Sequence, residues 1–178
     1  MRRRERMVRF LNANGPVLRF LALFVLAFGA CYFLLSISPG VKTGIIKPYT
    51  QLLASAVTSF INLFGAAATA DGTQVFSARF TIDIASGCDG VEASSLFVAG
   101  VLAFPTAWRT RMLGLALGIP AVHTINLLRL VGLYYAGVYL PSLFEELHVY
   151  VAQTIVILLS TALLILWLDR FAVQHRQS

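Results

Sequence analysis

Four long apolar runs divide the chain, and each is long enough to cross a lipid bilayer as a helix. They cover residues 17–37, 88–104, 112–128 and 149–168. A helix of roughly 17–25 mostly apolar residues spans the hydrocarbon core of a membrane. Such a helix also satisfies its own backbone hydrogen bonds, which lipid cannot do for it. The pattern therefore predicts an all-α polytopic membrane protein with about four transmembrane helices, built as a single integral membrane domain.

Three other segments show different patterns. Residues 49–70 carry no charge and are long enough to span, but their apolar positions recur at helical spacing, which favours an interfacial amphipathic helix. Residues 73–86 alternate between apolar and polar side chains, most clearly at 80–84, and predict a small β-hairpin. A lipid-exposed hairpin cannot lie in the hydrocarbon, so we expect this one in water or among headgroups. Residues 131–146, with three tyrosines and Pro141, are interpreted as an interfacial connection.

The composition narrows the class of protein. Hydrophobic residues make up 58% of the 178 residues, charged residues make up 12%, and the mean hydropathy is +0.78. A soluble domain usually carries about a quarter charged residues, so the composition excludes a soluble globule and a disordered chain. The formal net charge is +6, but the basic residues flank the apolar runs instead of covering a soluble surface. We therefore expect contact with membrane lipid and no nucleic-acid partner.

The basic residues also predict the orientation in the membrane. With four spans and residues 49–70 kept outside, ten lysines and arginines lie on the cytoplasmic side and four on the outer side. The cytoplasmic ten are Arg2, Arg3, Arg4, Arg6, Arg9, Arg19, Arg109, Arg111, Arg170 and Arg176, and the outer four are Lys42, Lys47, Arg79 and Arg129. Counting 49–70 as a span would violate the preference of basic residues for the cytoplasm. Both termini, including the basic tail over residues 1–16, are therefore expected inside, and the hairpin outside.

Three residues with complementary chemistry are expected at the outer edge of this bundle. Cys88 opens the second run from the outer side, and His148 opens the fourth. Arg129 lies 19 residues after Thr110. That is about 28 Å along a helix, or about one bilayer core from the inner side. A thiol, a guanidinium and an imidazole at one depth are the groups of a cysteine acyl-transfer site.

Each of these groups has a chemical role in such a site, and each also has a plainer explanation. A free thiol has a pKa of about 8.5, so a nucleophilic cysteine needs a base and a cation nearby. His148 would remove the thiol proton, and Arg129 would stabilise an oxyanion or hold the scissile carbonyl. Otherwise Cys88 is a packing residue, His148 an interfacial histidine, and Arg129 a lipid anchor. Asn126 shares a helix face with Arg129 and is a candidate supporting residue.

Other polar residues bear on the same site. Asp89 and Glu92 either pair with Arg129 or face water. His123 is a rival base, but it lies six residues before Arg129. That separation is about 9 Å along the helix, where core packing or a hydrogen bond to a neighbouring helix is favoured. Cys31, inside the first apolar run, is interpreted as a packing residue.

These residues lie in segments that resemble the exosortase/archaeosortase family of membrane-embedded cysteine transpeptidases, most closely the exosortase H subfamily. The likeness rests on Gly87-Cys88-Asp89-Gly90-Val91-Glu92-Ala93, Ala103-Phe104-Pro105, Asn126-Leu127-Leu128-Arg129 and Leu147-His148-Val149-Tyr150, within roughly residues 65–167. The resemblance implies that Cys88 is the nucleophile, His148 the base and Arg129 the stabilising cation. It also implies supporting or substrate-binding roles for Asp89, Gly90, Glu92 and Asn126. The family usually has a small polar residue after the cysteine, so the charge of Asp89 is a departure.

The resemblance further implies a substrate and a location. The substrates would be exported proteins that end in a short sorting motif, a transmembrane helix and a basic tail. The enzyme would lie in the bacterial inner membrane with its site facing away from the cytoplasm. The chain has no CxxC pair and no Cys/His metal spacing, so no metal or cofactor is expected. Two other functions stay open, a membrane thiol–disulfide carrier that uses Cys31 and Cys88, and a noncatalytic membrane assembly subunit.

Overall fold

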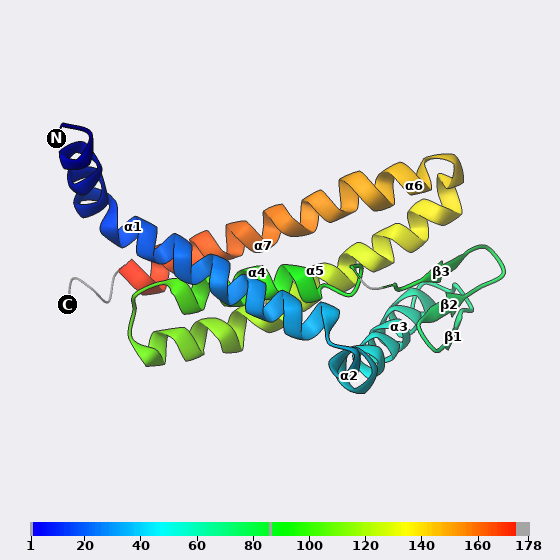
Figure 1. Ribbon diagram of the computed structural model, residues 1–178. Helices are drawn as coiled ribbons and strands as arrows, with labels where there is room; N and C mark the ends of the chain where they lie inside the picture. The colour runs from blue at the N-terminus through cyan, green and yellow to red at the C-terminus, as the bar shows by residue number, and fades with distance from the viewer. Residues whose placement is uncertain (1, 86, 174–178) are drawn as a thin grey trace.

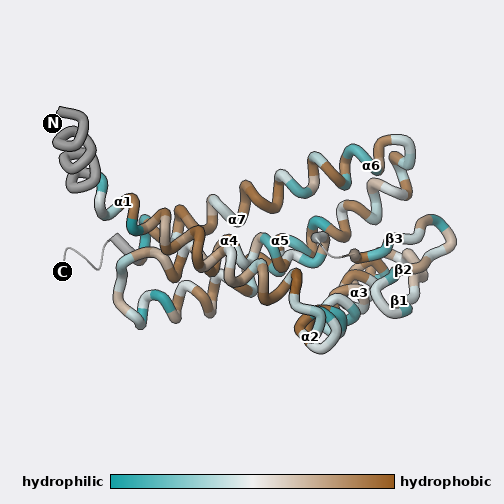
Figure 2. Tube along the Cα trace, in the orientation of Figure 1, coloured by the Kyte–Doolittle hydropathy of each residue, from teal (hydrophilic) through white to brown (hydrophobic). Residues whose placement is uncertain are grey.

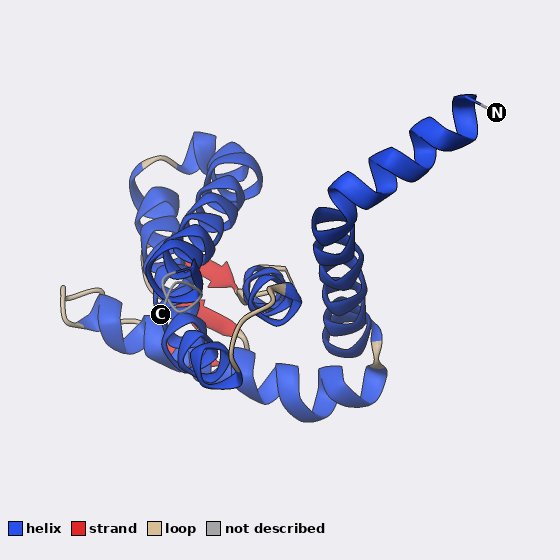
Figure 3. Cartoon of the chain, turned by 90° about the vertical axis from the view of Figure 1, so that its left-hand side faces the viewer, coloured by secondary structure: helices blue, strands red, loops and turns tan. Residues whose placement is uncertain are grey.

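Four helices form the apolar part of the molecule in the computed structural model, which describes residues 2–85 and 87–173 (Figure 1). They are α1 (Arg2–Tyr32), α4 (Val91–Ala103), α5 (Trp108–Tyr139) and α7 (Gln153–Trp167). Helix α4 lies in the middle and contacts α1, α5 and α7. Helix α1 stands to one side of the others (Figure 3). The predicted fold class, a helical multi-pass membrane protein, is confirmed.

Three helical stretches of the described residues are long and apolar enough to cross a membrane. They run over Asn14–Ile37, Trp108–Tyr139 and Pro141–Phe171, and α4 adds a shorter apolar helix. The most hydrophobic residues lie along these stretches (Figure 2). Residues 38–85, at the end of the molecule away from the N-terminus, mix hydrophobic and hydrophilic residues. Helix α4 begins at Val91 and not at Cys88, so the cysteine precedes the helix. A helix that is apolar on all sides is normally surrounded by others, and Phe97 and Val101 of α4 are fully buried.

The interfacial connection predicted over residues 131–146 is wrong for residues 131–139, which belong to a helix. Helix α5 continues through the tyrosines to Tyr139. The chain then turns and continues as η3 (Pro141–Leu143), α6 (Phe144–Glu146), η4 (Leu147–Ala152), α7 and η5 (Leu168–Val173). The helix persists because Leu130, Leu133 and Tyr134 are buried at helical spacing. Arg129 and His148 therefore lie inside helical stretches and not at their ends.

The segment after α1 leads away from the long apolar helices to the end of the molecule where apolar and polar residues are mixed. It contains η1 (Phe33–Ile37), α2 (Pro39–Val41), η2 (Lys42–Ile46) and the amphipathic α3 (Lys47–Asn62). Helix α3 buries Leu53, Val57 and Ile61 against the second half of α5 and a small sheet. The basic tail predicted over residues 1–16 belongs to α1 from Arg2 on, and Met1 lies outside the described residues.

The helix predicted over residues 49–70 ends early, at Asn62. The Asn62 side chain accepts a hydrogen bond from the Ala68 backbone N–H at 2.7 Å and donates one to the Ala68 carbonyl at 2.9 Å. Gly65 adopts a positive φ of 77°, which ends the helix and turns the chain. The chain therefore leaves the helix after Asn62. The residues after Ala68 enter a strand, which the sequence pattern did not predict.

That strand belongs to a three-stranded antiparallel sheet. The strands β1 (Thr69–Asp71), β2 (Gln74–Phe76) and β3 (Thr81–Asp83) lie in the order β1-β2-β3. The β2–β3 pair, with Val75 opposite Ile82, is the predicted hairpin, and β1 is an addition. Ser86, the last residue of the predicted hairpin, lies outside the described residues. The buried faces of α3, the sheet and α5 form one core, and Cys88 packs against it.

Candidate active site

The cysteine lies in a tight turn that precedes α4. Gly87 and Gly90 have positive φ values of 93° and 80°, which glycine adopts without strain. The Asp89 carboxylate accepts a hydrogen bond from the Val91 backbone N–H at 3.0 Å, which forms an Asx-type turn leading into α4. A Cβ on Gly90 would come within 2.9 Å of the Asn126 side chain. Glycine is therefore required here for both the backbone conformation and the close approach of α5.

The thiol of Cys88 contacts one residue from each of two helical stretches. The Sγ atom is 2.9 Å from Nε2 of His148, which lies in η4. The Nη2 group of Arg129, from α5, donates a hydrogen bond to Sγ at 3.6 Å. The wide turns of π-helical stretches such as η4 are frequent at functional sites. The structure thus brings together the three residues that were singled out as nucleophile, base and cation.

Asn126 connects the cysteine turn to the arginine. Its Nδ2 group donates a hydrogen bond to the Cys88 carbonyl at 3.1 Å, and its Oδ1 accepts one from Arg129 Nη1 at 3.2 Å. The side chain is fully buried. Because one amide holds both the backbone of Cys88 and the guanidinium of Arg129, their relative position is set by a rigid group.

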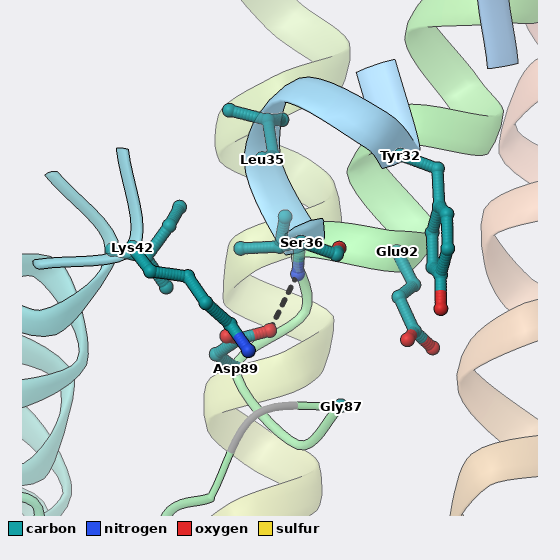
Figure 4. Close-up of a pocket in the computed structure, with 9 residues that line it drawn as sticks. Tyr32, Leu35, Ser36, Lys42, Gly87, Asp89 and Glu92 are labelled. Carbon is teal, nitrogen blue, oxygen red and sulfur yellow. Dashed lines mark hydrogen bonds between the residues drawn. The ribbon is translucent and has the colours of Figure 1, made fainter. Parts of the chain in front are cut away.

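The two carboxylates near the cysteine do not form ion pairs with Arg129 among the described residues. Asp89 is 3% exposed, and its carboxylate is bonded to the Val91 backbone N–H. Glu92 lines a pocket of about 230 Å³ with Tyr32, Ser36 and Lys42 (Figure 4). In this view the Lys42 side chain extends toward Asp89. The prediction that both acids either pair with Arg129 or face water is therefore wrong for Asp89, because its carboxylate is buried and bonded to the backbone of Val91.

Burial and charge act in opposite directions on the thiol. Burial raises the pKa of Cys88 above its ordinary value, while the charge and the hydrogen bond of Arg129 lower it. The negative charges of Asp89 and Glu92 add to the increase in the pKa of Cys88, and the net shift is upward. Burial also raises the pKa of Asp89. The thiol therefore needs a base to lose its proton, because its surroundings do not hold it as a thiolate.

A second hydrogen-bond network holds the cysteine turn from the side of α3. The Tyr49 hydroxyl donates to the Asp89 carbonyl at 3.1 Å and lies 2.7 Å from Nδ1 of His123. Since this hydroxyl has a single proton, Nδ1 of His123 donates to it, and Nε2 accepts from Ser94 Oγ at 3.2 Å. Burial raises the pKa of Tyr49 to about 12, so the hydroxyl stays protonated. His123 thus bonds neighbouring elements, one of its two expected roles, while Tyr49 was missed because nothing in its sequence context separates it from other aromatics of α3.

Cys31, in α1, and Cys88 are both free thiols, so the two cysteines do not form a disulfide in this structure. Within the described residues, no group of three or more His, Cys, Asp or Glu side chains is arranged to hold a metal ion. The polar groups that contact the Cys88 sulfur are those of Arg129 and His148, an arrangement suited to proton transfer and to stabilising negative charge.

Comparison with known proteins identifies the family. A family model described as transmembrane exosortase (Exosortase_EpsH) matches residues 11–170. The chain belongs to the transmembrane exosortase family. The match begins well before residue 65, so it includes the first apolar helix, which the motif resemblance treated as a generic span. No curated protein and no solved structure matches the chain. Exosortases act on exported proteins that carry C-terminal signals.

Proposed function

We propose that the chain is a membrane cysteine transpeptidase or protease that cleaves the C-terminal sorting signals of exported proteins. The observation that supports this most directly is the position of Cys88 Sγ, 2.9 Å from His148 Nε2 and within hydrogen-bonding reach of Arg129. A nucleophile in contact with a base and a cation is the arrangement that acyl transfer needs. Membership in the exosortase family supports the same class of reaction.

The first half of the reaction forms a thioester. Nε2 of His148 accepts the proton of Cys88, and the sulfur attacks the carbonyl carbon of the scissile peptide bond. The carbonyl oxygen becomes an oxyanion, which the guanidinium of Arg129 stabilises. When the intermediate collapses, the C–N bond breaks, and His148 returns the proton to the leaving amine. The product is an acyl group on Cys88 and a free signal peptide.

The second half releases the acyl group. An acceptor amine or hydroxyl, or a water molecule, attacks the thioester carbonyl after losing a proton to His148. The C–S bond then breaks, and the sulfur regains its proton. Transfer and hydrolysis differ only in which nucleophile arrives, so the same three residues serve both outcomes.

We further propose that the site faces away from the cytoplasm, in a bacterial inner membrane, with both termini inside. The asymmetry of basic residues supports this orientation. Single cysteines at Thr73 in the sheet region and at Arg109 at the start of α5 test it, in a background without Cys31 and Cys88. A membrane-impermeant maleimide on whole cells should label Thr73→Cys and not Arg109→Cys, and the reverse labelling would overturn the orientation.

The activity itself is tested by replacing the nucleophile. The substrate is a tagged exported protein from the same genome that ends in a short motif, an apolar stretch and an arginine cluster. Cys88→Ala and Cys88→Ser should both abolish its cleavage while the enzyme stays in the membrane, because a serine hydroxyl has no thiolate character near neutral pH. Cys31→Ser serves as the control and should cleave normally. Cleavage by Cys88→Ser at the wild-type rate would refute the proposed nucleophile and favour a noncatalytic role.

A further inference from the structure

An apolar groove lies beside the reacting groups, between α5 and the helical stretch formed by η4 and α7. Its volume is about 220 Å³. It is lined by Gly132 and Ala136 of α5, by Leu147, Val151 and Ile155 of the facing stretch, and by Arg129. Val151 and Ile155 are 46% and 47% exposed, so the groove is open along its side. Both of its walls belong to apolar stretches long enough to span a membrane, so this opening would face lipid.

Gly132 differs from the other three glycines of α5. The other three are each covered by an aromatic ring, with Trp167 against Gly114, Phe97 against Gly118 and Phe80 against Gly137. A Cβ on Gly132 would meet nothing within 4 Å. Glycine inside a helix is destabilising relative to alanine. The packing of this chain therefore explains three of the glycines, while the surface at Gly132 is not covered by any described residue.

Arg129 provides a polar group at this groove. Two of its guanidinium nitrogens bond Asn126 and Cys88, but its Nε–H is fully buried and has no hydrogen-bond partner among the described residues. A buried donor without a hydrogen-bond partner is destabilising. The groove is thus apolar along its length, and the unsatisfied donor lies beneath its surface next to the nucleophile, where a shift of the Arg129 side chain is needed to expose it. A peptide carbonyl beside an apolar segment satisfies both features.

From these observations we infer that the groove is the docking site for the apolar helix of the substrate, at the point where that helix joins the scissile bond. This inference rests on the proposed function. The apolar side chains of one helix face would fill the groove against Gly132. A shift of the Arg129 side chain on binding would then let a backbone carbonyl near the scissile bond accept a hydrogen bond from Nε. A helix bound there holds the scissile carbonyl beside Cys88 Sγ, which converts an encounter in the membrane into an oriented reaction.

Two other occupants fit the apolar surface less well. A lipid chain would fill the apolar wall, but it brings no peptide bond to Cys88 Sγ at the level of the nucleophile. A second copy of this chain would cover the side from which a membrane-embedded substrate approaches the thiol. Both are treated below as results that would overturn the inference.

A substitution that fills the groove provides the first test. Gly132→Leu has room for its side chain and strengthens the helix, so the protein should fold and insert normally. Cleavage of the tagged substrate should fall about tenfold or more, because the substrate helix is displaced from the thiol. Alkylation of Cys88 by iodoacetamide, measured with Cys31→Ser, should not change. Gly29→Leu, at an equally open glycine of α1, is the matched control and should cleave normally.

Photo-crosslinking identifies the occupant directly. A photoreactive residue at Val151, in an inactive Cys88→Ala background, should crosslink to the apolar part of the tagged substrate. The same residue at Ile157, equally exposed but not part of the groove, should not. Crosslinks from position 151 to lipid alone or to a second copy would overturn the inference. So would normal cleavage by Gly132→Leu in cells where wild type cleaves, whereas failure of wild type itself to cleave would refute the proposed function instead.

Discussion

The turn that carries Cys88 has two sides with opposite electrostatics. On the side of α5 and η4, Arg129 and His148 contact the sulfur directly. On the side of α1 and η2, Asp89 and Glu92 line a pocket, and their negative charges raise the pKa of the same thiol. The side with Arg129 therefore favours the thiolate form of Cys88, and the side with the two carboxylates disfavours it.

The two sides act on the same thiol in opposite directions. Burial and the two carboxylates raise the pKa of Cys88, and Arg129 lowers it. In the proposed reaction, His148 accepts the thiol proton, and Arg129 stabilises the negative charge that develops. The following substitutions weaken one side or the other.

The largest effect is expected from His148, since it is the sole proton acceptor in contact with the sulfur among the described side chains. Replacement by alanine should reduce cleavage by about 10²–10⁴-fold, which is the usual contribution of general acid–base catalysis. A pulse-chase of substrate cleavage at matched expression measures the loss. Glu145→Gln, an exposed change in the same helical stretch, should leave the rate unchanged. A loss below tenfold would remove His148 as the base.

Arg129→Lys should have the next largest effect. Lysine keeps the positive charge but loses the planar arrangement that holds Asn126 and Cys88 at the same time. Loss of one oxyanion donor typically costs about 10²–10³ in rate, so we expect cleavage at least about tenfold slower with normal insertion. The same pulse-chase, with Arg109→Lys on the opposite side of the bundle as control, measures it. Near wild-type cleavage would reduce Arg129 to a membrane anchor.

The effect of the carboxylates on the thiol is tested by Asp89→Asn. This change keeps an oxygen that accepts the hydrogen bond from the Val91 N–H and removes a negative charge. Because Asp89 raises the pKa of Cys88, its loss should lower that pKa, and alkylation by iodoacetamide should begin at lower pH. Arg129→Gln should shift the same profile to higher pH, since Arg129 lowers the pKa. The profiles are measured with Cys31→Ser, and Asp71→Asn is the control. Shifts in the same direction for both variants would contradict the two-sided description.

The smallest effect is expected from Tyr49→Phe, which removes the hydrogen bond to the backbone of the turn and the one between Tyr49 and His123. A net hydrogen bond is worth about 0.5–1.5 kcal/mol, which corresponds to a loss of about two- to tenfold in cleavage if it positions Cys88. Tyr135→Phe is a close control, because the Tyr135 hydroxyl is buried and has no partner among the described residues. Equal effects of the two changes would show that the Tyr49 bond does not position the nucleophile.

The sequence alone was sufficient for the class of fold and for the three candidate reactive residues. Apolar length predicts membrane helices because the bilayer has a fixed thickness. A constant helical rise predicts which residues share a depth, and it places Cys88, Arg129 and His148 at one level. The alternation over residues 80–84 predicted a strand for the same reason, since its period of two is a local property.

The tertiary structure decided where the local patterns compete. The sequence pattern predicts a connection around Tyr134, but these residues remain helical because they are buried against α3 and the sheet. The sequence pattern predicts a helix up to residue 70. Asn62 and Gly65 end α3 before that point, and residues 69–71 then pair with β2 as the strand β1. The Tyr49–His123 network and the groove beside Arg129 join segments far apart in the chain. Such contacts depend on distances between elements, and periodicity along one element carries no information about them.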